Sequence, residues 1–86
     1  MSALEVRLYG KPGCHLCEQA EELIEDLSTE YPISLQILDI TADPALFERF
    51  RYEIPVIEFL DGRSLAGRIS RAELRELLGP PRALTQ

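Results

Sequence analysis

Residues 10–17, Gly-Lys-Pro-Gly-Cys-His-Leu-Cys, decide how this chain is organised. They contain both cysteines of the chain, its only lysine and its only histidine. A short alternation of apolar residues precedes this stretch, and a long acidic segment with helical spacing follows it. The cysteine pair therefore lies where a strand ends and a helix begins. Free backbone N–H groups and the positive end of the helix dipole favour an anion there, and the Cys14 thiolate is the anion available.

The segments around the cysteine pair predict a strand–helix–strand unit. Apolar and polar residues alternate over 4–9, which predicts a strand, and glycines and a proline then predict a loop. Apolar residues at helical spacing predict a helix over about 15–29, whose acidic face we expect to be solvated. Tyr31-Pro32 ends this helix, and an apolar, β-branched strand is predicted over about 33–39. This order implies a parallel strand pair with a right-handed crossover.

The second half of the chain predicts a short helix and a hairpin. Asp43-Pro44 opens the helix, with Asp43 as the N-cap and proline at the first helical position. A strand is predicted over 55–60. Asp61-Gly62 then predicts a two-residue hairpin into a short antiparallel strand over about 63–66.

The last predicted helix completes the order βαβαββα. Ser70 caps it in a capping box with Glu73, and Gly79-Pro80-Pro81 stops it. We expect residues 79–86 to form a loose tail. This order fits an α/β fold, with a four-stranded mixed sheet and helices on both faces.

Length and charge restrict the class of protein. An 86-residue chain predicts a single domain over 1–86, with a core over about 4–78. The net charge of -6 leaves no basic patch for phosphates, so we expect no nucleic acid and no membrane surface as partners. No apolar run approaches the ~18–20 residues of a membrane span, and the first residues do not resemble a signal peptide. We therefore expect a cytoplasmic monomer.

Cys14 and Cys17 predict thiol–disulfide chemistry. Two cysteines separated by two residues, at a helix start inside a βαβ pattern, are a strong indication of it. Residues three apart lie on one side of a helix, so the second sulfur can reach the first. We expect Cys14, at the exposed edge, to attack a substrate disulfide. Cys17, further inside the helix, then resolves the mixed disulfide. The competing interpretation is a pair of idle buried cysteines.

Other interpretations of the same residues stay open. Cys14, His15 and Cys17 offer three soft ligands, whereas a closed zinc site needs four and the chain has no further Cys or His. A metal or iron–sulfur cluster bridging two subunits, or a non-catalytic adaptor, remains an alternative. A protonated His15 would favour the Cys14 thiolate, or its ring simply faces solvent. Lys11 holds an anionic substrate group or is an ordinary surface lysine. Pro55 either marks a strand start or follows a cis peptide bond.

The chain resembles small glutaredoxin-like proteins of the thioredoxin superfamily over residues 4 to about 78. The resemblance rests on residues 11–17, on Ile54-Pro55, and on Asp61-Gly62 followed by Ala66-Gly67. It implies a thioredoxin-like, three-layer α/β/α fold and a thiol–disulfide oxidoreductase that requires no organic cofactor or metal. Its substrate would be a disulfide-containing protein or a small thiol, and its reductant glutathione or a thioredoxin-reductase-type system.

The resemblance also assigns roles to single residues. It implies that Pro55 is cis and lies against the dithiol, that the backbone of Ile54 pairs with the substrate, and that Lys11 contacts glutathione. The chain departs from the usual glutaredoxin pattern at His15-Leu16, where Pro-Tyr is usual, and at Glu53, where threonine is usual. Glutathione is a candidate co-substrate, but the carboxylate of Glu53 would repel it, so we expect it to be a poor partner.

Overall fold

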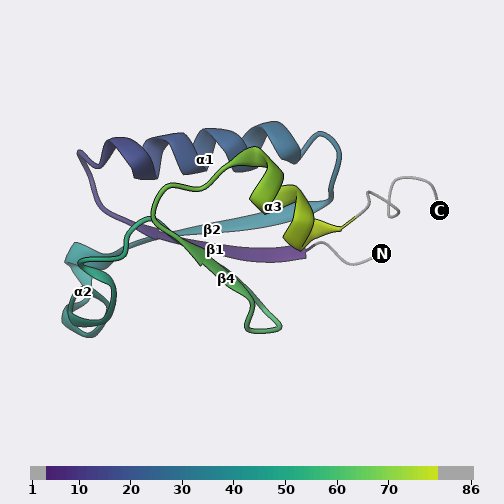
Figure 1. Cartoon of the computed structure of the whole chain (residues 1–86). Coiled ribbons are helices and arrows are strands. Elements are labelled where there is room, and N and C mark those ends of the chain that lie inside the picture. The colour runs from purple at the N-terminus through teal and green to yellow at the C-terminus, as the bar shows by residue number, and fades with distance from the viewer. Residues whose placement is uncertain (1–3, 80–86) are drawn as a thin grey trace.

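The computed structural model describes residues 4–79, which form one four-stranded mixed sheet flanked by helices (Figure 1). The strand order is β2-β1-β3-β4, with β1 parallel to β2 and antiparallel to β3, and β3 antiparallel to β4. The predicted order βαβαββα is confirmed, with one additional 3-10 turn, η1, after β2. The tail predicted over 79–86 lies, beyond Gly79, outside the described residues. The strands are β1 (Leu4–Gly10), β2 (Ile33–Asp39), β3 (Val56–Phe59) and β4 (Ser64–Ala66).

The helices lie on both faces of the sheet, which confirms the three-layer α/β/α prediction. Helices α1 (His15–Leu27) and α3 (Arg71–Leu78) cover one face. Helix α2 (Pro44–Phe50) lies on the other, next to η1 (Ile40–Ala42) (Figure 1). None of these helices has the length and apolar character that crossing a membrane would need.

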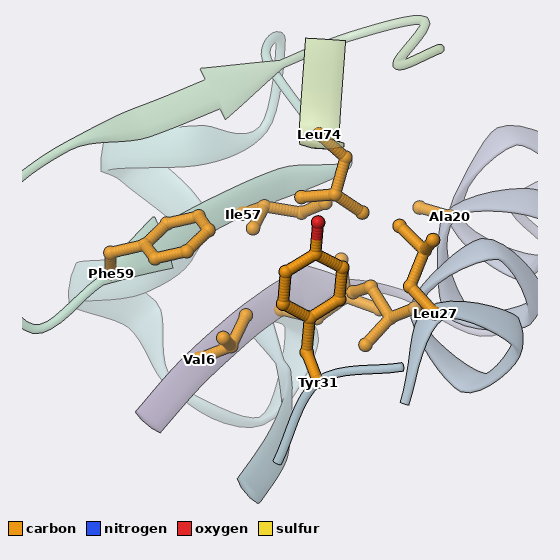
Figure 2. Close-up of a cluster of buried hydrophobic side chains, with 9 residues drawn as sticks. Val6, Ala20, Leu27, Tyr31, Ile57, Phe59 and Leu74 are labelled. Carbon is orange, nitrogen blue, oxygen red and sulfur yellow. The ribbon is translucent and has the colours of Figure 1, made fainter. Parts of the chain in front are cut away.

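The larger core fills the space between the sheet and the two helices α1 and α3 (Figure 2). Strand alternation sends every second side chain of β1 and β3 to this face, and the apolar stripe of α1 meets them. Tyr31 contributes its buried ring, and its hydroxyl donates a hydrogen bond to the Gly79 carbonyl oxygen over 2.6 Å. The buried members are Val6, Leu8, Ala20, Ile24, Leu27, Tyr31, Ile57, Phe59 and Leu74.

The smaller core on the opposite face covers only one end of the sheet. Tyr9, Ile40, Phe50 and Val56 are its buried members, and the Tyr9 and Phe50 rings lie 4.5 Å apart between centroids. Beyond this cluster the same face turns polar. The Tyr9 hydroxyl donates to Glu58 Oε1 over 2.8 Å, and an open hollow of about 270 Å³ follows over strands β1, β2 and β3.

The predicted helix caps are confirmed at both short helices. Asp43 Oδ1 accepts from the Ala45 N–H, and proline occupies the first helical position of α2. Ser70 and Glu73 form the predicted capping box of α3, with reciprocal bonds of 3.1 and 3.0 Å. Each cap satisfies backbone N–H groups that the helix itself leaves unpaired.

Two boundaries differ from the prediction. Helix α1 ends at Leu27 rather than near residue 29, because the hydroxyls of Ser28 and Thr29 bond back to carbonyls of the last turn. The two-residue hairpin is also wrong. The Phe59 N–H donates to the Arg63 carbonyl, so the loop has three residues, 60–62. Gly62 has a φ of 97°, which is typical of three-residue hairpin loops that end in a left-handed residue.

Candidate dithiol site

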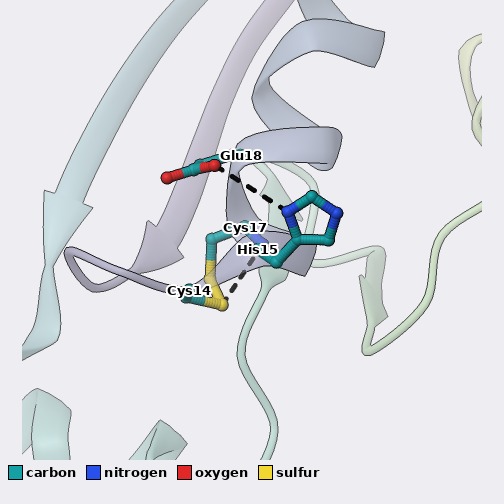
Figure 3. Close-up of a disulfide and its surroundings, with 4 residues drawn as sticks. All are labelled: Cys14, His15, Cys17 and Glu18. Atoms are coloured by element: carbon teal, nitrogen blue, oxygen red, sulfur yellow. Dashed lines mark hydrogen bonds and ion pairs between the residues drawn. A yellow bond between two sulfur atoms is a disulfide. The ribbon is translucent and has the colours of Figure 1, made fainter.

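The cysteine pair lies at the junction of β1 and α1, as predicted. Cys14 is the N-cap of α1, with extended backbone angles, and its Sγ accepts a hydrogen bond from the Cys17 N–H over 3.2 Å. In this structure the two residues form a disulfide, with their Cα atoms 5.2 Å apart (Figure 3). A sulfur held at a helix N-terminus by a backbone N–H is stabilised in its anionic form once the disulfide is reduced.

The two sulfurs differ in access. Cys14 is half-buried, whereas Cys17 is only 7% exposed and packs in the first turn of α1. A thiolate must reach the disulfide sulfur that it attacks, so access decides which cysteine meets a partner. The arrangement makes Cys14 the outer sulfur and Cys17 the inner one.

Gly10 makes room for Cys17, a role that the sequence reasoning missed. A Cβ atom at position 10 would lie 2.9 Å from Cys17 Sγ and 3.1 Å from Cys17 Cβ. By strand alternation, residue 10 faces the same side as Val6 and Leu8, toward α1. Cys17 therefore occupies the place that a side chain on residue 10 would take. The signal in the sequence was a glycine that continues the apolar alternation immediately before the loop.

Pro55 lies across the sheet from Gly10, the residue against which Cys17 packs. Tyr9 pairs with Val56 in the antiparallel ladder, so one step further along this register Gly10 lies opposite Pro55. Pro55 is fully buried, and the peptide bond that precedes it is cis. Ile54 is half-buried against the smaller core, and its N–H donates to the Phe50 carbonyl over 3.1 Å.

The two other predicted site residues, Lys11 and His15, differ in how their side chains lie relative to the cysteine pair. The His15 ring is 81% exposed, and its Nδ1 is 4.0 Å from Glu18 Oε1, so the ring extends away from the sulfurs (Figure 3). The Lys11 carbonyl accepts from the Cys14 N–H over 3.4 Å, and its side chain is exposed. Lys11 and Cys17 also line the same hollow, of about 250 Å³. The structure therefore brings Lys11 to the rim of the site and directs His15 to solvent.

Asp39 reaches the same edge of the sheet, although the sequence reasoning did not single it out. The parallel register places Asp39 next to Gly10. Its Oδ1 accepts from the Thr41 hydroxyl over 2.6 Å and from the Thr41 N–H over 2.8 Å, which starts turn η1. The side-chain bond, followed by the backbone bond, lowers the pKa of Asp39 below its ordinary value. The spacing Asp-x-Thr after a strand was the available signal.

Metal-ligating residues do not gather at this site. Within residues 4–79, no three Cys, His, Asp or Glu side chains are arranged to hold a metal ion. Cys14 and Cys17 supply two sulfurs, fewer than the four ligands of a closed zinc site.

The fold and the paired cysteines define a small glutaredoxin-like protein of the thioredoxin superfamily. Residues 5–79 match the family described as Glutaredoxin-like domain (DUF836), and the chain belongs to this family. An uncharacterized protein of Mycobacterium tuberculosis is 32% identical over 68 residues, which cover 73% of this chain and 69% of that protein.

Solved structures agree on the fold. The X-ray structure of protein XcR50 from X. campestris has a TM-score of 0.73 at 30% identity, and the match covers 85% of this chain and 93% of that protein. Protein Ne2328 from Nitrosomonas europaea has a TM-score of 0.75 at 19% identity, and the match covers 91% of this chain and 93% of that protein. A mutant thioredoxin from Halobacterium salinarum has a TM-score of 0.71 at 17% identity, and the match covers 88% of this chain and 72% of that protein.

Proposed function

We propose that this protein is a thiol–disulfide oxidoreductase in which Cys14 is the nucleophile and Cys17 the resolving thiol. The observation that carries the proposal is the asymmetry of the pair. Cys14 Sγ caps α1 and accepts the Cys17 N–H, whereas the Cys17 side chain is buried. A helix start favours the thiolate, which is the nucleophile in disulfide exchange.

The proposed cycle has two exchange steps, and it moves two electrons. The Cys14 thiolate attacks one sulfur of a substrate disulfide, forms a mixed disulfide and releases the first substrate thiolate. The Cys17 thiol loses its proton to solvent and attacks Cys14 Sγ, which releases the second substrate thiolate. The substrate is reduced to two thiols, and the protein ends with the Cys14–Cys17 disulfide present in this structure.

Four further residues shape the approach to Cys14 in this proposal. Pro55, fully buried opposite Gly10, shapes the backbone over which a substrate would approach the dithiol. The Ile54 N–H is engaged by the Phe50 carbonyl, so backbone pairing with a substrate would use the Ile54 carbonyl oxygen. Lys11 adds positive potential at the rim, and His15, directed to solvent, contacts the substrate rather than the sulfur.

The partners that we propose follow from this chemistry. The substrate is a disulfide-containing protein or the disulfide of a small thiol, and the reductant is glutathione or a thioredoxin-reductase-type system. No organic cofactor or metal takes part. We propose that the protein acts as a monomer in the cytoplasm, without nucleic-acid or membrane partners.

The test is a comparison of the two cysteines in the reduced protein. Iodoacetamide labelling, followed on each cysteine by mass spectrometry against pH, should modify Cys14 faster. With a small disulfide probe, Cys14→Ser should abolish exchange, and Cys17→Ser should trap a mixed disulfide on Cys14. Faster labelling of Cys17, or full exchange by Cys14→Ser, would reject the assignment of roles.

Glutathione is expected to be a weak partner because of Glu53. This side chain is exposed just before the Ile54–Pro55 segment, and its carboxylate would repel the negative net charge of glutathione. Lys11 offsets part of this repulsion. In a glutathione mixed-disulfide assay, Glu53→Thr should raise the rate a few-fold at low ionic strength, where screening is weakest. Glu48→Gln, which removes one exposed carboxylate from α2, is the control. An unchanged rate for Glu53→Thr would contradict the charge explanation.

A further inference from the structure

A hollow of about 250 Å³ lies next to the dithiol, on the side of β1 opposite Pro55. The loop after β1, the first turns of α1 and the end of β2 form its walls. Its lining includes Cys17 and Gly13, the residue directly before Cys14. Cys14 does not itself line the hollow, but it directly follows Gly13 and is bonded to Cys17, which both do.

One wall of the hollow is aliphatic. Leu8 and Ile37 contribute to it, and Ile37 is 53% exposed. Within residues 4–79 the other large exposed apolar side chains are Tyr52 and Leu60, and neither lines this hollow. An exposed aliphatic wall gains free energy when the stem of a partner side chain covers it.

The rim of the hollow is negatively charged. Glu18, Glu21 and Asp39 supply three carboxylates, and Lys11 supplies the single ammonium group. The Thr41 hydroxyl and N–H hold Asp39 in place. Because carboxylates outnumber cations three to one, and the whole chain carries a net charge of -6, the hollow favours a cation over an anion.

We propose that this hollow binds a lysine or arginine side chain located next to the disulfide cysteine of a protein or peptide substrate. The aliphatic stem packs on Ile37, and the cationic head reaches the carboxylates of Glu18 and Glu21. This inference rests on the proposed oxidoreductase function and names its substrate class as basic disulfide segments. The covalent steps are those of the two-step cycle, with the reduced protein supplying both electrons.

The test compares three peptide disulfides in a single turnover of the reduced protein. Each is a disulfide-linked pair of acetyl-X-Cys-X-amide, with X as lysine, norleucine or glutamate, so that both neighbours of the cysteine are the same. Every rate is divided by that of dithiothreitol with the same peptide, because flanking charges change the reactivity of the disulfide itself. We expect the lysine peptide to exceed the glutamate peptide on the order of fivefold at low salt, with norleucine between. At 1 M salt, where the screening length is about 3 Å, the preference should nearly vanish.

Matched variants distinguish the effect of carboxylates in the hollow from the effect of the net charge of the protein. The double variant Glu18→Gln/Glu21→Gln should bring the lysine-to-glutamate ratio close to one. The control double variant Glu22→Gln/Glu25→Gln removes two exposed carboxylates from the same helix, outside the hollow, and should keep most of the preference. Ile37→Ser should slow the lysine and norleucine peptides and leave the glutamate peptide nearly unchanged. An equal effect of the two double variants would overturn the site.

The outcomes distinguish this inference from the function on which it rests. If the wild-type protein reduces none of the three peptides, the proposed oxidoreductase function fails. If it reduces all three with equal normalised rates, that function stands and the cation subsite is wrong.

Discussion

The two faces of the sheet differ in how completely they are covered. On one face, α1 and α3 bury nine residues in a continuous core, and Ile24, Leu27, Ile57 and Leu74 are at most 1% exposed. On the other face, α2 and η1 bury four residues at one end, and the rest is an open polar surface. Strand alternation supplies apolar side chains to both faces at the α2 end, but only to the α1 face elsewhere.

The covered face and the edge that carries the dithiol have different roles: the first stabilises the fold, and the second exposes the reactive cysteine. The larger core holds the sheet and α1 together. The dithiol lies at the edge where β1 ends, and there both cores are close: Cys17 packs against Gly10 on the α1 face, and Pro55 adjoins Ile54 of the smaller core. A site at this edge can expose Cys14 while buried residues hold its partners.

The largest expected effect is on the larger core. Leu27→Ala removes a fully buried side chain from α1, and we expect it to lower the free energy of unfolding by about 2–5 kcal/mol. Leu46→Ala makes the same chemical change in α2, where the side chain is half-buried, and should cost about 1 kcal/mol. Urea unfolding of both variants measures the difference. Equal losses of unfolding free energy would show that the two faces contribute alike to stability.

A smaller effect is expected where the larger core meets the site. Gly10→Ala places a methyl group 2.9 Å from Cys17 Sγ, and the overpacking should cost about 1–3 kcal/mol. Displacement of Cys17 should also slow its attack on the mixed disulfide, so that the mixed disulfide on Cys14 persists. Rapid quenching with acid, followed by mass spectrometry, measures this lifetime.

The control for this variant is Gly62→Ala. Its φ of 97° makes any side chain there strained, yet no atom outside its immediate neighbours lies within 4 Å of the added methyl group. It should destabilise the protein and leave the lifetime of the mixed disulfide unchanged. If Gly10→Ala resolves as fast as Gly62→Ala, the contact with Cys17 does not position the thiol.

The smallest expected effect is on the open face. Tyr9→Phe removes the hydroxyl that donates to Glu58, and should cost about 1 kcal/mol at pH 8, because Glu58 is partly exposed and can be hydrated instead. Burial, followed by the bond to Glu58, raises the pKa of Tyr9 above 10.0. The stability from this group is therefore complete below pH 10 and is lost as the pH rises through the raised pKa. Urea unfolding at pH 8 and pH 11 should show the difference between wild type and Tyr9→Phe shrinking. A constant difference would contradict this.

Local signals predicted most of the fold. The alternation over 4–9 and the caps at Asp43 and Ser70 depend on neighbours within a few residues, and these predictions are confirmed. The hairpin at Asp61-Gly62 was correctly located, but its length was wrong. The ladder between β3 and β4 sets the number of loop residues, and this pairing is not a local property.

Local sequence patterns were sufficient to predict the element order, the position of Cys14 at the start of α1 and the proximity of Cys17, since residues three apart on a helix lie on one side of it. The surroundings of the two cysteines depend instead on long-range packing. The placement of Cys17 against Gly10, of Pro55 across the sheet, and of Asp39 and Ile37 around the hollow depends on the register of three strands. Pairing between segments distant in the chain is fixed by the packing of the whole sheet, and no local pattern of residues encodes it.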